Sequence, residues 1–312
     1  MSRTASRASL VLCAAGIAIL VAEVVARLVG VGTHFANPFN TPTRTVDGVL
    51  LWNHQQPRYD GAEIRRAAAD RGAFKILGLG DSIMYGIGQA KEETYLEQTR
   101  RALAGRSTRA VEILNLAVPG FNTMQENAAY KEIEDQIRPD LVIVHYWGDD
   151  AIQYGVVGGL VFNLGDIAPD GHLVRALPLS PRLSDFLLMH SRLYDLLTEV
   201  ALARNRNAQP QDWTRVTMPL AAIHERALRA QARLLVLASA DLSGPSPKPT
   251  FELAALREFA APRGIEVIDL TEWLRGVDSK QIGMDGCHLN AEGHRLIGEH
   301  LADYLLQHDL QP

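Results

Sequence analysis

Beyond residue 73, short apolar runs alternate with longer segments in which apolar residues recur at helical spacing. The short runs hold few polar residues, which is typical of strands that are covered on both faces of a sheet. This alternation predicts a three-layer α/β fold, with helices on both faces of a central five-stranded parallel sheet. The predicted strands are residues 74–79, 111–117, 141–146, 233–238 and 265–269. The predicted helices are residues 61–71, 92–103, 123–137, 184–204, 217–231, 250–261 and 290–306.

The first part of the chain has a different pattern, because residues 9–32 are almost wholly apolar and only Glu23 and Arg27 interrupt them. This length is about what a helix needs to cross a bilayer. Arg3 and Arg7 precede the apolar stretch, so the positive-inside rule predicts a cytoplasmic N-terminus and an outward-facing remainder. Glu23 and Arg27 are four residues apart and can pair on one helix face near the far interface, which lowers the cost of burying either charge.

A cleaved signal peptide is the alternative for this segment, because small residues such as Ala22 and Ala26 would permit cleavage. The apolar stretch is longer than the core of a usual signal peptide, which favours an uncleaved transmembrane anchor. A lipoprotein signal is disfavoured, since Leu12 precedes Cys13 and the apolar run follows the cysteine. We therefore predict a single-pass protein of the inner (cytoplasmic) membrane whose main domain faces the periplasm or exterior, with secretion after cleavage as the alternative.

The pattern divides the chain into three parts. Residues 1–32 form the cytoplasmic tip and the anchor, residues 33–72 form a tether with an N-terminal extension, and residues 73–312 form the main domain. Within that domain, residues 151–183 are rich in glycine and hold few helix formers together. This stretch is interpreted as an inserted loop or small hairpin beside the functional site.

Composition narrows the range of partners and cofactors. The chain has 312 residues, of which 47% are hydrophobic and 21% charged, as in ordinary globular proteins. The net charge of -5 is spread along the sequence, and no basic stripe with interleaved aromatic residues indicates nucleic-acid binding. Cys13 and Cys287 are the two cysteines, so the sequence predicts neither a disulfide framework nor a zinc site. No metal and no organic cofactor is expected.

Three polar residues carry the candidate chemistry. Ser82 follows the apolar run 74–79, whereas Asp285 and His288 lie three residues apart near the C-terminus. A serine hydroxyl is a poor nucleophile until a base takes its proton, and His288 is the predicted base. Asp285 would accept a hydrogen bond from the other imidazole nitrogen and fix the tautomer. Because ligands of parallel sheets bind at the carboxyl ends of strands, the position of Ser82 fits a nucleophile.

The order and spacing of these motifs resemble the SGNH (GDSL) hydrolase family over roughly residues 73–308. The resemblance implies a flavodoxin-like sandwich and cleavage or transfer of an acyl group carried on oxygen. It also implies an oxyanion hole formed by the backbone amides of Ser82 and Gly120 and by the side chain at position 149. Gly120 lies in a block, residues 116–123, that is similar to the second block of the family.

Position 149 departs from the family pattern, in which an asparagine follows the glycine. Here the run is Gly148-Asp149-Asp150, and an ionised aspartate donates no hydrogen bond and repels an oxyanion. Three interpretations stay open. Asp149 is protonated in the site, the oxyanion hole works with two backbone donors, or the activity is weak or absent.

Other histidines and other enzyme classes are less well supported. His145 lies inside a predicted strand and is interpreted as a core residue, and His294 and His300 as packed or solvated residues of the last helix. Cys287 is expected to be a small packed residue. An α/β-hydrolase would need the motif Gly-x-Ser-x-Gly around Ser82, and this motif is absent. The glycine patterns of dinucleotide-binding and P-loop proteins are absent as well.

The sequence thus predicts a membrane-anchored, outward-facing serine esterase. Its orientation favours acetyl esters of envelope glycans as substrates, followed by lipid esters. An O-acetyltransferase of similar fold, or a catalytically weak glycan-binding or scaffold protein, is the alternative, the latter because of Asp149. The oligomeric state stays open.

Overall fold

The computed structural model describes residues 3–31, 44–46, 49–51, 58–59, 61–148, 150, 154–157, 160–163, 166–168, 170–206, 213–250 and 252–310. The chain forms two compact units. The smaller unit comprises Met1–Pro42 and Gln153–Gln211, and the larger unit comprises Thr43–Ile152 and Asp212–Pro312.

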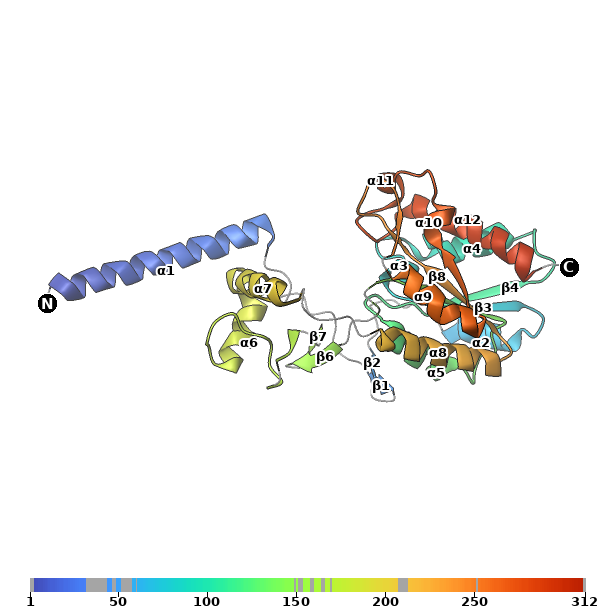
Figure 1. Ribbon diagram of the computed structural model, residues 1–312, viewed down its shortest axis with the longest axis horizontal. Coiled ribbons are helices and arrows are strands. Elements are labelled where there is room, and N and C mark those ends of the chain that lie inside the picture. Colours follow the sequence, from blue (N-terminus) through green and yellow to red (C-terminus); the bar gives the residue numbers. More distant parts are fainter. Residues whose placement is uncertain are drawn as a thin grey trace. The chain divides into compact units, whose positions relative to one another are not determined.

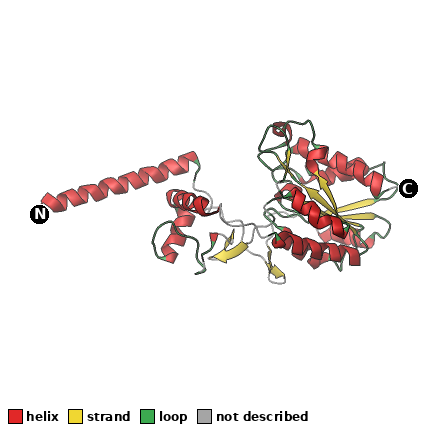
Figure 2. Cartoon of the chain, viewed as in Figure 1, coloured by secondary structure: helices red, strands yellow, loops and turns green. Residues whose placement is uncertain are grey.

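A sheet of five parallel strands forms the centre of the larger unit (Figure 2). The strands are β3 (Phe74–Leu79), β4 (Val111–Asn115), β5 (Leu141–Tyr146), β8 (Arg233–Ala238) and β11 (Glu266–Asp269), in the spatial order β11-β8-β5-β3-β4. The chain therefore moves from β3 to β4 on one side and crosses to β5 on the other side of β3. This is the flavodoxin-like order, and it confirms the predicted fold class.

The register places Gly78 of β3 beside Asn115 of β4 and Ile143 of β5. Neighbouring parallel strands consequently end at the same edge of the sheet. A crevice outside the carboxyl ends, at the point where the chain changes direction, is the usual ligand site of such sheets.

Helices cover both faces of the sheet (Figure 1). The strands supply both cores by strict alternation, so that Leu77 and Leu79 join one core and Phe74 and Ile76 join the other. The first core includes side chains of α2 (Gly61–Ala69), α5 (Thr123–Ile133), α8 (Thr214–Arg229) and α9 (Leu253–Ala260). The second includes side chains of α3 (Ser82–Tyr85), α4 (Tyr95–Leu103), α10 (Leu270–Trp273), α11 (Ser279–Ile282) and α12 (Ala291–His308).

Short elements complete the larger unit. They are the hairpin of β1 (Arg44–Val46) and β2 (Val49–Leu51), the antiparallel pair β9 (Ala240–Asp241) and β10 (Lys248–Pro249), and the 3-10 turns η1 (Lys91–Glu93) and η3 (Ala261–Arg263). The first hairpin and α2 lie within the predicted N-terminal extension. Residues 32–43 of the predicted tether lie outside the described residues.

The smaller unit contains α1 (Arg3–Val29), a hairpin of β6 (Tyr154–Val157) and β7 (Leu160–Asn163), and the helices α6 (Pro181–His190) and α7 (Arg192–Arg206). Its own core gathers Val157, Phe162, Leu173, Leu188 and Tyr194. Within α1, Val11–Val29 is long and apolar enough to cross a membrane, with a mean hydropathy of 2.2.

One predicted helix, residues 184–204, is wrong in its continuity, because the structure has two helices that meet at Ser191. Ser191 is extended, with φ -115° and ψ 114°, and its Oγ accepts a hydrogen bond from the N–H of Tyr194. Serine favours such a capping position over a helix interior. The apolar periodicity continues through this break, so the pattern alone did not reveal it.

Gly298 permits a close approach of α12 to α4. A Cβ atom there would lie 2.5 Å from Cβ of Gln98 and 2.8 Å from the carbonyl oxygen of Tyr95. Gly298→Ala should therefore lower the free energy of unfolding by about 1–3 kcal/mol, because backbone atoms of α4 must move. Urea unfolding of the full chain in detergent, followed by tryptophan fluorescence, measures this loss.

Gly61→Ala is the matched control. A Cβ atom at Gly61, the first residue of α2, would meet within 4 Å only the end of the flexible Arg65 side chain. This variant should keep the wild-type midpoint or raise it slightly, since alanine favours helix. Equal midpoints for the two variants would contradict the close packing of α12 on α4.

Candidate active site

The turn after β3 is built on two glycines that let α3 fold back on the strand. A Cβ atom at Gly78 would lie 2.6 Å from Cδ1 of Leu96, and one at Gly80 would lie 2.8 Å from Cβ of Met84. Asp81 then caps α3, since its Oδ1 accepts a hydrogen bond from the N–H of Ile83 at 2.8 Å. Ser82, the first residue of α3, is thereby held at the carboxyl end of β3.

A closed loop before α12 carries the other two predicted residues. The N–H of Met284 donates to the carbonyl of His288 at 2.8 Å and so closes the loop. Oδ1 of Asp285 accepts hydrogen bonds from the N–H groups of Cys287, at 2.9 Å, and of His288, at 2.8 Å. Asn290 caps α12 directly after the loop by accepting from the N–H of Gly293. The loop geometry thus fixes Asp285 against the residue that it is predicted to orient.

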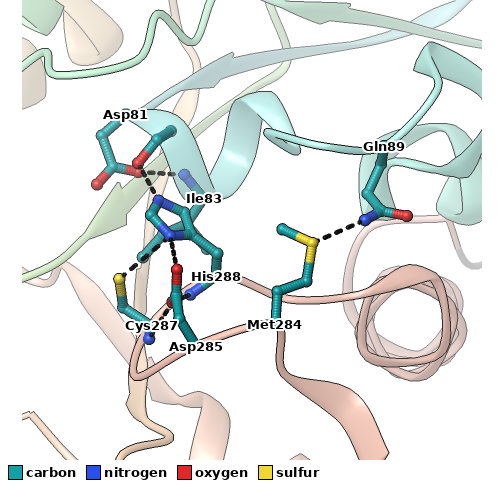
Figure 3. A network of polar contacts seen from close by, with 8 residues as sticks. Asp81, Ile83, Gln89, Met284, Asp285, Cys287 and His288 are labelled. Atoms are coloured by element: carbon teal, nitrogen blue, oxygen red, sulfur yellow. Dashed lines mark hydrogen bonds and ion pairs between the residues drawn. The ribbon is translucent and has the colours of Figure 1, made fainter. Parts of the chain in front are cut away.

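The structure brings Ser82, Asp285 and His288 together. Oγ of Ser82 lies 2.8 Å from Nε2 of His288, although 206 residues separate them in sequence. Nδ1 of His288 lies 2.8 Å from Oδ2 of Asp285 (Figure 3). An imidazole held between a hydroxyl and a carboxylate in this way can take the proton of the hydroxyl while the carboxylate stabilises the imidazolium.

Asp285 is ionised over the whole working range of an enzyme. Partial burial would raise the pKa of Asp285, but the N–H donors of Cys287 and His288 and the imidazole of His288 outweigh it and lower the pKa to about 2. A permanent carboxylate accepts from Nδ1–H of His288 and leaves the lone pair of Nε2 directed at Ser82. The pKa of Asp285 therefore supports the predicted tautomer.

The loop after β4 runs beside the turn that carries Ser82. The N–H of Val118 donates to the carbonyl of Gly80 at 3.0 Å, and Gly120 follows with a left-handed φ of 78°. Among the residues that the structure describes, neither the N–H of Ser82 nor that of Gly120 donates a hydrogen bond. Asp149 lies outside the described residues. Two of the predicted oxyanion donors thus have no acceptor among the described residues.

Arg58 is a site residue that the sequence did not reveal. Its guanidinium donates to the carbonyl oxygens of Tyr85, Gly86 and Gln89 at 2.7–2.9 Å, and it lies 4.1 Å over the ring of Tyr85. These carbonyls lie at the end of α3 and in the turn that follows it, so Arg58 fixes the C-terminal end of the helix that Ser82 begins. An arginine in a polar segment is usually solvated, and no sequence signal distinguishes this one.

The remaining histidines near the site are packed. His145 is fully buried with Nδ1 2.8 Å from the Tyr95 hydroxyl, and burial, reinforced by His294, lowers its pKa to about 3. Nδ1 of His294 accepts from the N–H of Tyr95, and burial together with the charge of Arg58 lowers the pKa of His294 to about 4. Both rings are neutral at neutral pH and pack in the interior, whereas Nε2 of His288 lies 2.8 Å from Oγ of Ser82.

Cys287 is partly buried and packs against the second core. Its Sγ lies 3.6 Å from Nδ1 of His288. Within the described part of the chain, Asp285, Cys287 and His288 are a group whose ligand atoms are close enough to hold a metal ion. An ion there would take Nδ1 of His288 away from Asp285, so the geometry fits the hydrogen-bonded relay better than a metal site.

The fold and this arrangement of a serine, a histidine and an aspartate define a serine hydrolase on a parallel α/β sheet. The sequence matches the GDSL-like Lipase/Acylhydrolase family over residues 79–296, and the chain belongs to that family. The protein is accordingly a serine hydrolase that acts on ester bonds. No curated protein matches the sequence.

Solved structures are similar to this chain at low identity. TesA is 15% identical with a TM-score of 0.45, covering 74% of this chain and 97% of its own. A lipolytic protein of the G-D-S-L family from Veillonella parvula is 14% identical with a TM-score of 0.45, covering 77% and 100%. The acetyl xylan esterase AlAXEase is 14% identical with a TM-score of 0.45, covering 74% and 99%.

Asp285→Asn tests the relay. The amide oxygen can still accept from the two loop N–H groups, but the NH2 group cannot accept from Nδ1–H of His288. The value of kcat should fall by about 10⁴-fold, as expected when the histidine adopts the wrong tautomer. Because the pKa of Asp285 is about 2, the carboxylate is ionised throughout pH 6–9, and the loss should be equal across that range.

Asp278→Asn is the matched control for this variant. Asp278 caps α11 by accepting from the N–H of Lys280 at 3.0 Å, with the same local geometry but no imidazole contact. Its activity should equal that of the wild type. If Asp285→Asn keeps more than about a tenth of the wild-type kcat, the orienting role of Asp285 is wrong.

Proposed function

We propose that this esterase works through an acyl-enzyme formed on Ser82. Nε2 of His288 takes the proton from Oγ of Ser82 as Oγ attacks the carbonyl carbon of the ester. The imidazolium, stabilised by Asp285, then gives that proton to the leaving alcohol, and the acyl group remains on Oγ. Water attacks the acyl-enzyme with His288 again as base, which releases the carboxylic acid and restores Ser82. The 2.8 Å contact between Ser82 and His288 is the observation that carries this proposal.

The oxyanion of each tetrahedral intermediate needs donors that are already in place. The backbone N–H groups of Ser82 and Gly120 are proposed for this role, since among described residues neither donates elsewhere. Asp149 stands at the position of the third family donor. A carboxyl group can donate there only in its protonated form, and we propose that Asp149 acts in that form.

The proposed substrates are acyl esters, acetyl esters above all, on glycans of the cell envelope. The helix α1 supports this proposal, because an anchor that spans Val11–Val29 with Arg3 and Arg7 inside leaves the catalytic residues outside. A cavity of about 430 Å³ borders Asp285 and Gly286 and includes Leu242, Pro245 and Met284 in its wall. A cavity of this size beside the loop of Asp285 is proposed to hold a part of the substrate other than the acetyl group.

Ser82→Ala in the full chain, in detergent, tests the nucleophile. Hydrolysis of p-nitrophenyl acetate, butyrate and octanoate should fall to the rate without enzyme, because no other group can carry the acyl chain. An organophosphonate should label the wild type at Ser82, as mass spectrometry of the labelled peptide would reveal. Acetate should be the preferred chain length.

Thr108→Ala, at an exposed hydroxyl just before β4 and so at the opposite edge of the sheet from Ser82, is the control and should keep full activity and labelling. Equal rates for wild type and Ser82→Ala would contradict the acyl-enzyme. Two inert proteins would favour a glycan-binding role, and turnover that appears only when a sugar acceptor is added would favour an acetyltransferase.

Asp149 is tested by a pair of variants. Asp149→Asn supplies an amide donor that needs no bound proton, so its kcat/KM should equal or exceed that of the wild type and should fall less as the pH rises. Asp149→Ala removes the donor and should lower kcat by about 10²–10³-fold. A large loss in Asp149→Asn would show that the acidity of Asp149 is needed and would refute the donor role.

A further inference from the structure

The outer end of α1 is bonded to the turn between α6 and α7 within the smaller unit. The carboxylate of Glu23 accepts hydrogen bonds from the Ser191 hydroxyl at 2.8 Å and from the N–H groups of Arg192, at 3.1 Å, and Leu193, at 3.0 Å. These N–H groups begin α7 and have no partner inside the helix. Glu23 therefore caps a helix that lies 168 residues or more further along the chain.

Arg27 completes the contact from the next turn of α1. It pairs with Glu23 at 2.7 Å and donates to the carbonyl of His190, the last residue of α6, at 2.7 Å. A carboxylate thus meets a helix N-terminus and a guanidinium meets a helix C-terminus, which suits both helix dipoles. Ala26 between them is buried. The end of α1 is part of the fold of this unit, which supports retention of the helix over cleavage.

The position of Glu23 sets the depth of α6 and α7. Glu23 precedes Val29, the end of the candidate span, by six residues, or about 9 Å at the rise of an α-helix. With Val11–Val29 in the bilayer, the turn at Ser191 lies about 9 Å inside the outer end of the span, at the depth of the outer leaflet. The two helices that meet there cannot both stay clear of the lipid.

Both helices expose apolar side chains beside buried polar ones. On α6, Leu183 and Phe186 are 47% and 54% exposed, whereas Ser184 and Asp185 are buried together with Leu188 of the core. Asp185 is satisfied inside the unit by the ring of His172, at 2.6 Å, and by a backbone N–H. A helix in water usually turns its large apolar side chains inward and its carboxylates outward.

The helix α7 likewise exposes apolar side chains beside buried polar ones. Leu197 and Val200 are 48% and 50% exposed, whereas Asp195 and Thr198 are buried. The exposed residues recur three apart on each helix, so each helix presents one apolar stripe. Phe186 stacks on His190 at 4.3 Å, which joins the stripe of α6 to the contact with Arg27 and α1.

We propose that Leu183, Phe186, Leu197 and Val200, the apolar face of α6 and α7, lie against the lipid of the outer leaflet beside α1. Lipid is the occupant that fits, because the face continues from the contact with the anchor and lies at the depth of the outer leaflet. Helices that lie in the interface bury an apolar face in this way. The proposal rests on the anchor proposed above and is independent of the chemistry at Ser82.

The test uses the full chain in vesicles of phosphatidylethanolamine and phosphatidylglycerol. Cys13 and Cys287 are replaced by serine, and single cysteines at Phe186 and Leu197 are labelled with the fluorophore NBD. Quenching by phospholipids with a nitroxide near the top of the acyl chain reports contact with lipid. The control is Asp170→Cys, in the loop whose His172 contacts Asp185 on the opposite face of α6.

Quenching at positions 186 and 197 should exceed that at position 170 by about twofold or more. If the protein floats with the vesicles but quenching is equally weak at positions 186, 197 and 170, the proposed lipid contact of α6 and α7 is wrong while the anchor stands. Failure to float would overturn both. A second copy of the chain on this face would also overturn the proposal. It would protect the NBD group from the nitroxide, and the unlabelled cysteine at position 186 would form a crosslink between two chains. Hydrolysis of p-nitrophenyl acetate by the same vesicles tests the catalytic proposal separately.

Discussion

The hydrogen bond between Ser82 and His288 is the interaction on which the arrangement of the site depends. It joins the turn after β3 to the loop before α12, two segments that lie 206 residues apart in the sequence. Gly78 and Gly80 let α3 lie on the sheet, and Arg58 holds the end of α3 from behind. Together these features hold the hydroxyl oxygen of Ser82 at the carboxyl edge of the sheet.

Much of this arrangement could be predicted, for physical reasons. Strands such as Leu141–Tyr146 are apolar on both faces, which leaves the sequence pattern little ambiguity. Asp285 and His288 contact each other within one loop, so their spacing already indicated the pair. Contacts between distant segments were not visible in the sequence. The bonds of Arg58 to α3 and the cap that Glu23 places on α7 depend on tertiary structure, and the break at Ser191 lies within an uninterrupted apolar periodicity.

Burial gives the same polar residue types different roles in the two units. His145 and His294 are neutral because they are buried, and they pack, whereas His288 is partly exposed and meets both a hydroxyl and a carboxylate. In the smaller unit, Asp185 and Asp195 are buried while leucines and a phenylalanine face outward. Apolar side chains that face outward beside buried carboxylates favour surroundings less polar than water, which agrees with the lipid contact proposed for this face.

The closed loop of Met284 to His288 has a consequence for motion. Asp285 and His288 are held by bonds within that loop, so thermal displacement carries the two residues together. Ser82 begins α3 and reaches the loop through the contact of its Oγ with Nε2 of His288. The separation of Nδ1 from Oδ2 is therefore set within one loop, whereas the separation of Oγ from Nε2 depends on how that loop lies on the rest of the unit.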